Sequence, residues 1–525
     1  MSSYYFTEEH ELFRQSLRTF LEKEAIPHID KWEEERRTPR DIWKKMGEMG
    51  FLGLSYPEKY GGMGLDFFYD VVFNEELGRT GSGGFAITQQ VVQYMSGPYI
   101  LKYGSDALKD KYLPGLISGD LISSIGITEP GAGSDVQGIK TKAIKDGDHY
   151  IVNGAKTFIT NGVYGDLIIT VVKTNPELGA AGVSLLLIDQ DTPGISRRKL
   201  KKLGWHCSDT AELNFDNVKV PVTNLIGEEG RGFFYLMNGL QLERLCAVPA
   251  AVTGMDTAIE QTLKYMSERE AFGRPINKFQ VLRHRIAQMA SEVEALRAFS
   301  YQCCQMYAEN VYDVKMCSMA KLLATELSEK VATQCLQFFG GYGFMEEYPM
   351  ARMYRDVRVG TIGGGSSEIM REIIAKMIID DKDFKPAKSD FKLKTRATKK
   401  EPAMAMAAAS SNGSSNGHAT SDGVNNVKSM DGLVSMIQGQ AGKADALGNT
   451  LKFDFGGQHL YIDGTGDSNQ VSADDKAADC TVNMELADFE DLMKGDLNPM
   501  TAFMSGKMKI DGDMGVAMKL QNLFG

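Results

Sequence analysis

The hydrophobic pattern of this chain changes its period along the sequence, and each change limits what a segment can fold into. Up to about residue 120, apolar residues such as Leu17, Phe20 and Leu21 recur on one face of a helix. Short apolar runs rich in β-branched residues follow, for example residues 167–172, and Gly, Asp and Asn separate them. Long helical patterns with few breakers then return. We therefore predict an all-α N-terminal domain (1–120), a middle β-barrel or β-sandwich domain (121–230) and a four-helix bundle (231–380).

Composition changes again near residue 381. The following residues are rich first in lysine, then in alanine and methionine, then in serine, asparagine and glycine, and no aromatic residue lies between Phe391 and Phe453. Such a stretch cannot supply a core, so we predict a flexible linker over residues 381–424. Polar and apolar residues alternate beyond it, as in residues 451–455, which predicts a separate α+β domain over residues 425–525.

Charge and hydropathy exclude some classes of function. The chain carries 58 basic and 69 acidic residues, a net charge of −11, so it lacks the basic footprint of a nucleic-acid-binding protein. No run of about 18 uncharged apolar residues predicts a transmembrane helix. Residues 1–11 are acidic and lack the features of a signal or transit peptide, and Leu523-Phe524-Gly525 is not a peroxisomal tripeptide. We expect an intracellular, cytoplasmic protein.

Cysteine and histidine are scattered. The seven cysteines include no C-x-x-C pair, which favours reduced, mostly buried thiols. The seven histidines share no ligand spacing with one another or with a cysteine, so we predict no metal site.

Common nucleotide-binding loops are absent from the sequence. It contains no Walker A motif, and the glycine-rich string at residues 81–84 follows a helical pattern where a dinucleotide motif needs a strand. Residues 127–135, Ile-Thr-Glu-Pro-Gly-Ala-Gly-Ser-Asp, are more informative. Their glycines let the backbone approach a flat or phosphorylated ligand, and Thr128 and Ser134 offer hydroxyl donors. Taken alone, this segment could equally be an ordinary glycine turn.

Five further motifs follow in order: Lys-Thr-Phe-Ile-Thr-Asn-Gly (156–162), Arg-Glu-Ala-Phe-Gly (269–273) with Phe-Gln (279–280), Gln-Phe-Phe-Gly-Gly-Tyr-Gly (337–343), Arg-Asp-Val-Arg (355–358) and Gly-Gly-Gly-Ser-Ser-Glu-Ile (363–369). In this order and spacing, the motifs closely resemble the acyl-CoA dehydrogenase family of flavoproteins over about residues 1–380. The resemblance implies the three-domain fold predicted above, an FAD cofactor, and dehydrogenation between Cα and Cβ of an acyl-CoA. It also implies electron transfer to an electron-transferring flavoprotein, and a homodimer or homotetramer.

The same resemblance implies site residues, motif by motif. The residues that would contact FAD are Ile127, Thr128, Phe158 and Thr160 at the flavin ring; Arg269, Phe272 and Gln280 at the pyrophosphate and adenosine, across a subunit boundary; Gln337, Gly340 and Gly341 on the adenine side; and Ser366, Ser367 and Glu368 at the remaining diphosphate contacts. The residues that would contact acyl-CoA are Ser134, Gln241, Arg244, Gly364 and Gly365. For Arg269 alone, a surface salt bridge with Glu270 is the alternative.

The catalytic base departs from the commonest family pattern. Many members carry a glutamate in a Tyr-Glu-Gly-Thr string, and the matching position here is Gly364. A second pattern, similar to isovaleryl-CoA and long-chain acyl-CoA dehydrogenases, places the base before an arginine in the first bundle helix, where this chain has Glu243 and Arg244. Neighbouring leucines would desolvate Glu243 and raise its pKa, as a base needs. We therefore predict Glu243 as the base, against the alternative of an exposed Glu–Arg pair.

Two expectations follow from the moved base. Gly364 could still donate its backbone N–H to the thioester carbonyl, a role that needs no side chain. The space that a glutamate would fill at this position is free, so we expect medium, long or branched acyl chains as substrates.

The last domain resembles the sterol carrier protein (SCP-2-type) lipid-transfer family over about residues 425–525. That family folds as a five-stranded sheet with helices around an apolar tunnel, and the resemblance implies a bound fatty acyl or sterol lipid. Methionines suit such a tunnel, although core filling explains them equally well; they are Met484, Met493, Met500, Met504, Met508, Met514 and Met518. A linker of about 45 residues would tether this domain within roughly 35–40 Å of the enzyme.

Two alternatives remain for the function as a whole. One is an acyl-CoA oxidase or flavin monooxygenase on the same fold, which oxygen consumption would distinguish from dye reduction. The other is a catalytically silent acyl-CoA- or lipid-binding protein, which the missing glutamate at Gly364 suggests.

Overall fold

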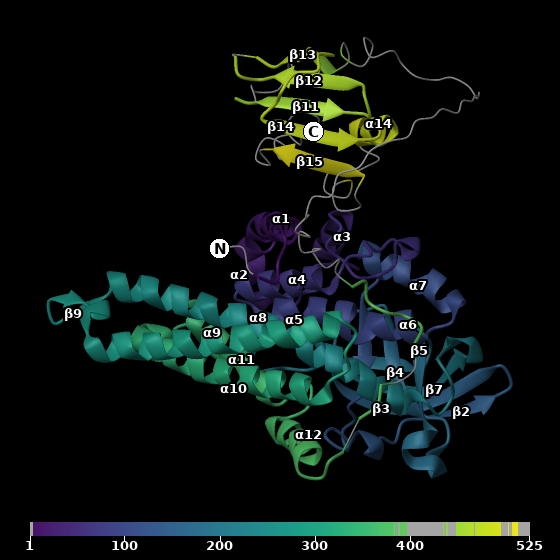
Figure 1. The fold of residues 1–525 in the computed structure, drawn as a ribbon. Helices are drawn as coiled ribbons and strands as arrows, with labels where there is room; N and C mark the ends of the chain where they lie inside the picture. The colour runs from purple at the N-terminus through teal and green to yellow at the C-terminus, as the bar shows by residue number, and fades with distance from the viewer. Residues whose placement is uncertain are drawn as a thin grey trace, which may run out of the picture. The chain divides into compact units, whose positions relative to one another are not determined.

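The computed structural model describes residues 4–382, 384–386, 389–395, 434, 437–438, 448–466, 468–494, 502 and 507–512. The chain forms two compact units, residues 1–396 and 397–525, which we describe separately (Figure 1). Most of the predicted linker lies outside the described residues.

The first unit begins with a layer of helices. Thr7 caps the first of them, because its side-chain oxygen accepts a hydrogen bond from the backbone of His10. A π-helical turn, η3, connects α5 to α6 without a break, a feature that often marks a functional site. The elements are α1 (Glu8–Glu24), α2 (Ile29–Glu35), α3 (Arg40–Glu48), α4 (Phe67–Arg79), α5 (Gly83–Gln90), η3 (Val91–Ser96), α6 (Gly97–Tyr103) and α7 (Asp106–Ser118).

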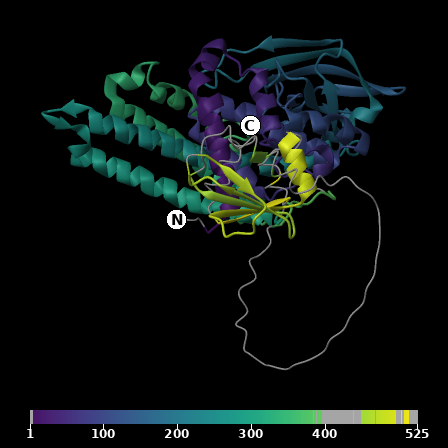
Figure 2. The same ribbon diagram turned by 90° about the horizontal axis from the view of Figure 1, so that it is seen from above.

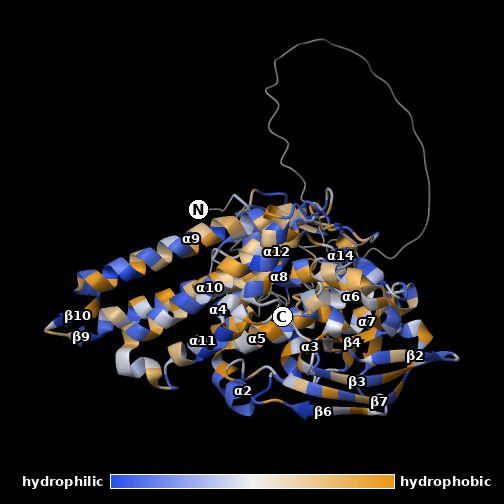
Figure 3. Cartoon of the chain, turned by 90° about the horizontal axis from the view of Figure 1, so that it is seen from below, coloured by the Kyte–Doolittle hydropathy of each residue, from blue (hydrophilic) through white to orange (hydrophobic). Residues whose placement is uncertain are grey.

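A single eight-stranded sheet follows, in the order β6-β7-β3-β2-β4-β5-β8, with β1 parallel to β4. Its strands are β1 (Ser123–Gly126), β2 (Lys142–Asp146), β3 (His149–Thr160), β4 (Leu167–Lys173), β5 (Val183–Asp189), β6 (Ile195–Lys199), β7 (Thr210–Pro221) and β8 (Leu225–Ile226). Strands β3 and β7 alternate between hydrophobic and hydrophilic residues, so one face of the pair packs on the core (Figure 3). The middle domain is therefore a β-domain, as the sequence predicts.

Long helices complete the first unit. Helix α8 has 37 residues and is about 55 Å long at 1.5 Å per residue. A small hairpin, β9–β10, joins it to α9 at the end remote from the sheet (Figures 1 and 2). The elements are α8 (Gly232–Glu268), β9 (Glu270–Ala271), β10 (Arg274–Pro275), α9 (Gln280–Ala308), α10 (Val314–Phe339), η8 (Gly340–Phe344), α11 (Pro349–Val357), η9 (Arg358–Thr361) and α12 (Ser367–Ile378).

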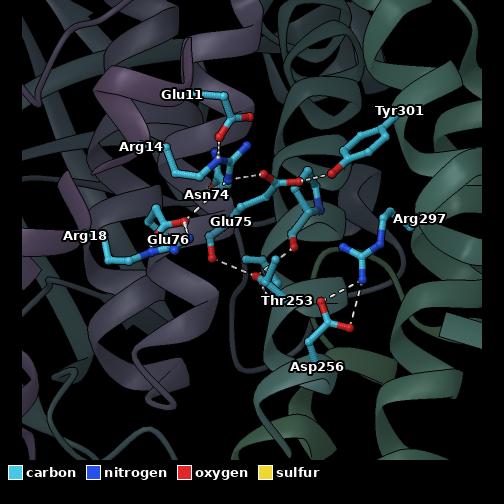
Figure 4. A network of polar contacts seen from close by, with 12 residues as sticks. Glu11, Arg14, Arg18, Asn74, Glu75, Glu76, Thr253, Asp256, Arg297 and Tyr301 are labelled. Carbon is cyan, nitrogen blue, oxygen red and sulfur yellow. Dashed lines mark hydrogen bonds and ion pairs between the residues drawn. The ribbon is translucent and has the colours of Figure 1, made fainter. Parts of the chain in front are cut away.

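Buried charges fasten the N-terminal helices to the bundle (Figure 4). Arg14 of α1 lies 2.6 Å from the carboxylate of Glu75 on α4, which also accepts a hydrogen bond from the hydroxyl of Tyr301 on α9. The hydroxyl of Thr253 on α8 donates to the Glu75 backbone carbonyl at 2.7 Å. Burial raises the pKa of Glu75, and the positive charge of Arg14 and the hydrogen bond from Tyr301 oppose the rise, so removal of either partner would raise this pKa further.

The second unit contains a five-stranded sheet in the order β13-β12-β11-β14-β15, as the sequence resemblance implies. Its elements are β11 (Thr450–Asp454), β12 (His459–Asp463), β13 (Gln470–Ser472), β14 (Cys480–Met484), α14 (Leu486–Lys494) and β15 (Met508–Gly512). Met484 and Met508 are buried in its hydrophobic core, so these two fill the core. Met500, Met504, Met514 and Met518 lie outside the described residues, as does the side chain of Met493.

No helix among the described residues has the length and apolar character needed to cross a lipid bilayer.

Candidate active site

Glu243 lies about three turns into α8, and its side chain is 8% exposed. The Tyr99 hydroxyl donates a hydrogen bond to its carboxylate at 2.9 Å. Burial raises the pKa of Glu243 to about 7, although the Tyr99 hydrogen bond and the positive charge of Arg244 oppose the rise. The predicted burial of this glutamate is therefore confirmed, and the exposed Glu–Arg pair is not what forms.

Two buried cations attach the Gly364 turn to α8 and to α10. Arg244 Nε donates to the carbonyl oxygen of Gly364 at 3.3 Å, and Lys321 Nζ of α10 donates to that of Gly365 at 2.6 Å. Burial lowers the pKa of Lys321 to about 8, and it also lowers that of Arg244. Although Arg244 and Gly364 are far apart in sequence, this hydrogen bond brings them together, and we call Tyr99, Glu243, Arg244, Lys321, Gly364 and Gly365 the inner cluster.

Gly364 adopts a backbone conformation that suits glycine. Its φ is +64°, and a Cβ built on it would meet no atom within 4 Å. A larger residue would therefore have room here but would be strained, because left-handed φ is unfavourable for L residues. Lys321 was not among the predicted site residues. In the sequence, it stands out only as a lysine beside an alanine on the apolar face of a predicted helix.

The predicted flavin-ring residues lie together on the β-domain. The Thr128 carbonyl accepts a hydrogen bond from Thr157 N at 2.9 Å, which places residues 127–128 beside residues 157–160. The pairing of β3 with β7 is irregular between Lys156 and Ile159, and there Phe158 has a φ of +63° and is 69% exposed. An exposed aromatic ring in a strained backbone is a reason to expect a functional contact. We call Ile127, Thr128, Phe158 and Thr160 the β-face group.

A buried ion pair supports this group. Lys156 Nζ lies 2.8 Å from Glu129 Oε1 and donates to the Ile127 carbonyl at 3.1 Å. Burial lowers the pKa of Lys156 to about 8. Burial would raise the pKa of Glu129, but Lys156 and the backbone N–H of Lys140 and of Thr141 hold it below its usual range. The pair was missed by sequence reasoning, although both residues lie inside motifs that were recognised.

Two predicted substrate residues differ in exposure. Ser134 is exposed on the loop after β1. Gln241 is buried on α8; its Nε2 donates to the Met237 carbonyl at 3.0 Å, and its Oε1 has no partner among the described residues.

The predicted adenosine-arm residues lie at the other end of α8. Phe272, at a φ of +52°, is 95% exposed, and Gln280, Gln337, Gly340 and Gly341 are exposed beside the hairpin. Within the described part of the chain, Arg269 forms no ion pair with Glu270; its guanidinium lies 5.8 Å from the Tyr342 ring centroid, which joins the hairpin to η8. We call Arg269, Phe272, Gln280, Gln337, Gly340 and Gly341 the outer cluster.

The inner and outer clusters are well separated within one chain. Twenty-five helical residues from Arg244 to Arg269 span about 38 Å at 1.5 Å per residue. The β9–β10 hairpin lies at the end of the helices remote from the sheet (Figures 1 and 3).

Ser366, Ser367 and Glu368 form the start of α12. The Ser366 hydroxyl accepts from Ile369 N as the helix cap, whereas the buried Ser367 hydroxyl has no partner among the described residues. All three line a groove of about 540 Å³, together with residues such as Lys330 and Arg358. The hydrogen bonds at the helix start lower the pKa of Glu368. Across the residues described, no three His, Cys, Asp or Glu side chains are grouped so that they could hold a metal ion.

Comparison with known proteins agrees with this arrangement. Models of the N-terminal, middle and C-terminal domains of acyl-CoA dehydrogenase match residues 7–120, 124–218 and 230–379, and that of the SCP-2 sterol transfer family matches residues 436–525.

Relatives cover the same part of the chain. The mitochondrial long-chain specific acyl-CoA dehydrogenase of Mus musculus is 41% identical over 72% of this chain and 88% of its own length. The mitochondrial isovaleryl-CoA dehydrogenase of Oryza sativa subsp. japonica is 36% identical over 72% of this chain and 93% of its own. The crystal structure of an acyl-CoA dehydrogenase from Geobacillus kaustophilus is 47% identical, with a TM-score of 0.70 over 72% of this chain and 100% of its own.

Proposed function

The chain belongs to the acyl-CoA dehydrogenase family and ends in an SCP-2 domain, and we propose that it forms a Cα–Cβ double bond in medium, long or branched acyl-CoA, with FAD as cofactor and Glu243 as base. The observation that carries the proposal is the buried carboxyl of Glu243, whose pKa of about 7 suits a general base at neutral pH. It also argues against a silent lipid-binding protein, because an inert site has no need of a desolvated carboxyl.

In this proposal, Glu243 removes the proton from the substrate Cα. Tyr99 fixes one carboxylate oxygen by its hydrogen bond of 2.9 Å, and the other, which has no hydrogen bond to any described residue, can accept the proton. Arg244 follows Glu243 in sequence and donates to the Gly364 carbonyl, which fixes the position of the Gly364 turn. Among the described residues, the Gly364 N–H has no acceptor, so it is available to the thioester carbonyl oxygen, where negative charge develops.

FAD, when bound, would accept the hydride from Cβ. The residues fit this cofactor: the β-face group offers an exposed Phe158 ring and half-buried Thr160, and Arg269 offers the forked donors that suit a diphosphate. A Cβ added at Gly340 or Gly341 would meet no atom within 4 Å, so a dinucleotide can approach the backbone closely there.

Because one chain keeps its outer cluster about 38 Å from its inner cluster, a second copy would have to supply the outer cluster. We therefore propose a homodimer or homotetramer. An electron-transferring flavoprotein is the proposed electron acceptor.

The SCP-2 domain is proposed to bind a fatty acyl or sterol lipid and to raise the local supply of acyl-CoA through its tether. Cleavage at about residue 416, which lies outside the described residues, should then raise KM for long-chain acyl-CoA. An unchanged KM would argue against the supply role.

The decisive test is anaerobic bleaching of the flavin by acyl-CoA in Glu243→Gln. We expect the variant to retain flavin but to be reduced about 10²–10⁴-fold more slowly, which is the contribution of a positioned base. Glu260→Gln, an exposed glutamate of the same helix, is the matched control. Normal bleaching of Glu243→Gln would refute the assignment.

The same wild-type preparation tests the oxidase or monooxygenase alternative. Rapid oxygen consumption on addition of acyl-CoA, without reduction of an added dye, would favour it.

A further inference from the structure

A short extended segment follows the bundle and packs back onto it. We call residues 389–395 the strap. Exposure alternates along it, because Ser389, Phe391 and Leu393 are half-buried while the residues between them are exposed. This period of two means that one side of the strap faces the protein and the other faces solvent.

Specific hydrogen bonds hold the strap in place. The side-chain amide of Asn310, just after α9, accepts from Leu393 N at 3.1 Å and donates to the Leu393 carbonyl at 3.4 Å, as a neighbouring strand would. At the other end, the Ser389 hydroxyl donates to the Lys102 carbonyl of α6 at 3.3 Å. Asn310 itself has a φ of +60°, a conformation that asparagine tolerates better than most residues. These hydrogen bonds therefore fix the position of the strap on the first unit.

The inward side chains of the strap close a cavity. Phe391 and Leu393 line it, together with Leu242, the residue before Glu243. The remaining space is about 20 Å³, room for about one water molecule and far too little for an alkyl chain. It is also lined by Phe67, Asp70, Tyr94, Lys102 and Tyr307.

Several polar groups of this cavity are bonded within its wall, whereas Asp70 Oδ2 has no hydrogen-bond partner among the described residues. The Tyr94 hydroxyl donates to Asp70 Oδ1 at 3.0 Å, and Lys102 Nζ donates to the Tyr307 hydroxyl at 3.3 Å. The rings of Phe67 and Tyr307 pack with centroids 4.7 Å apart. The surface that meets Phe391 and Leu393 thus includes aromatic and aliphatic carbon that an alkyl chain could equally cover.

We propose that the strap closes the far end of the acyl-binding cavity and can be displaced from it, so that Phe391 and Leu393 set the acyl length that the enzyme accepts. This inference rests on the proposed function, since it takes Glu243 to mark the reacting end of the substrate. A chain that extends from Glu243 past Leu242 reaches the cavity that the strap fills. Short acyl groups end before it, whereas long ones have to displace Phe391 and Leu393.

The strap lies at the C-terminal end of the first unit. Residues 389–395 are the last described residues before the connection to the second unit. A long acyl chain that displaces the strap would therefore free residues 389–395, which precede that connection, whereas a short one would not.

The proposal is tested in the full-length holoenzyme by comparing kcat/KM for palmitoyl-CoA and butyryl-CoA. In Phe391→Ala/Leu393→Ala, we expect the palmitoyl-to-butyryl ratio to rise at least about tenfold, because the misfit of even one methylene in an apolar pocket discriminates to this degree. The matched control is Asp390→Ala/Lys392→Ala, which changes only outward-facing side chains of the same segment and should leave the ratio unchanged.

A second variant keeps the test informative if Phe391→Ala/Leu393→Ala fails to fold. Asn310→Ala removes both hydrogen bonds to Leu393 but keeps every cavity-lining side chain, and it should shift the ratio in the same direction by a smaller factor. Amide hydrogen exchange at residues 389–395 should also increase with bound palmitoyl-CoA and not with butyryl-CoA.

The outcomes separate the two proposals. If wild-type flavin is bleached by acyl-CoA but neither variant changes the ratio and exchange does not respond, the strap proposal fails and the proposed function stands. If neither acyl-CoA bleaches the wild-type flavin, both proposals fail.

Discussion

The inner and outer clusters lie toward opposite ends of the same helix, α8, and they differ in burial and in bonding to the rest of the chain. At Glu243 and Arg244 every charged group is buried and bonded to another part of the same chain, from Tyr99 to Gly364. At Arg269 and Phe272 the side chains extend into solvent. The difference indicates that one chain builds its proposed reaction centre alone but leaves the proposed cofactor arm to be completed by another molecule.

The largest effect on stability is expected at the buried ion pair between Lys156 and Glu129, which supports the β-face group. Lys156→Met leaves the Glu129 carboxylate buried without its cation, which should lower the free energy of unfolding by about 3–5 kcal/mol. Denaturant unfolding of the full chain measures the change. The double variant Lys156→Met/Glu129→Gln should recover part of the loss, and additive losses would show that the two residues act independently.

The next largest effect is expected on FAD affinity at the outer cluster, without a change in the free energy of unfolding. Arg269→Ala removes the hydrogen bonds of a charged donor to the proposed diphosphate, worth about 1.5–3 kcal/mol, so FAD affinity should fall about 10–100-fold. The flavin-to-protein absorbance ratio after gel filtration reports this. Lys264→Ala, an exposed lysine near the end of the same helix, is the control. A large loss of unfolding stability in Arg269→Ala would break the contrast between the clusters.

Glu243 should make stability depend on pH in a way that the outer cluster does not. Its pKa rises from 4.5 to about 7 on folding, so the folded state binds the extra proton and loses stability as pH increases from 4.5 through 7. Glu243→Gln should therefore be more stable than wild type at pH 8, by roughly 1–3 kcal/mol, and about equal to it at pH 4. Thermal unfolding at the two pH values measures the difference; an equal effect at both would contradict the raised pKa.

The smallest effect compares one glycine of each cluster. Gly364→Ala forces an L residue to a φ of +64° and should cost roughly 1 kcal/mol of unfolding free energy. Gly341→Ala also enters open space, but without a positive φ, and should change stability by less than about 0.5 kcal/mol. Equal costs at the two sites would show that backbone strain is not what distinguishes the Gly364 turn.

Local pattern was enough to predict the classes of the domains and the burial of Glu243. Hydrophobic period distinguishes helix from strand, and the leucines around Glu243 are close in sequence, so the desolvation of the carboxyl follows from neighbours along one helix. The family resemblance supplied the order of the motifs and the alternate position of the base.

The contacts that position these motifs could not be predicted in the same way. Lys321 reaches Gly365 from another helix, and Lys156 reaches Glu129 from an adjacent strand, so both depend on how elements pack. The separation of the inner and outer clusters follows from the unbroken length of α8, which continues through Pro249 where a sequence pattern would favour a kink. The roles of the site residues and the domain boundaries stay predictions.

All seven cysteines of the chain are buried. Burial raises the thiol pKa of six of them, Cys207, Cys246, Cys303, Cys304, Cys317 and Cys335, so at neutral pH they remain protonated and unreactive. The native chain should therefore give little background with thiol-directed dyes. A cysteine introduced at Lys392 and another at the exposed Asp474 could be labelled selectively, and energy transfer between the two dyes would report how the strap and the lipid-binding unit move during turnover.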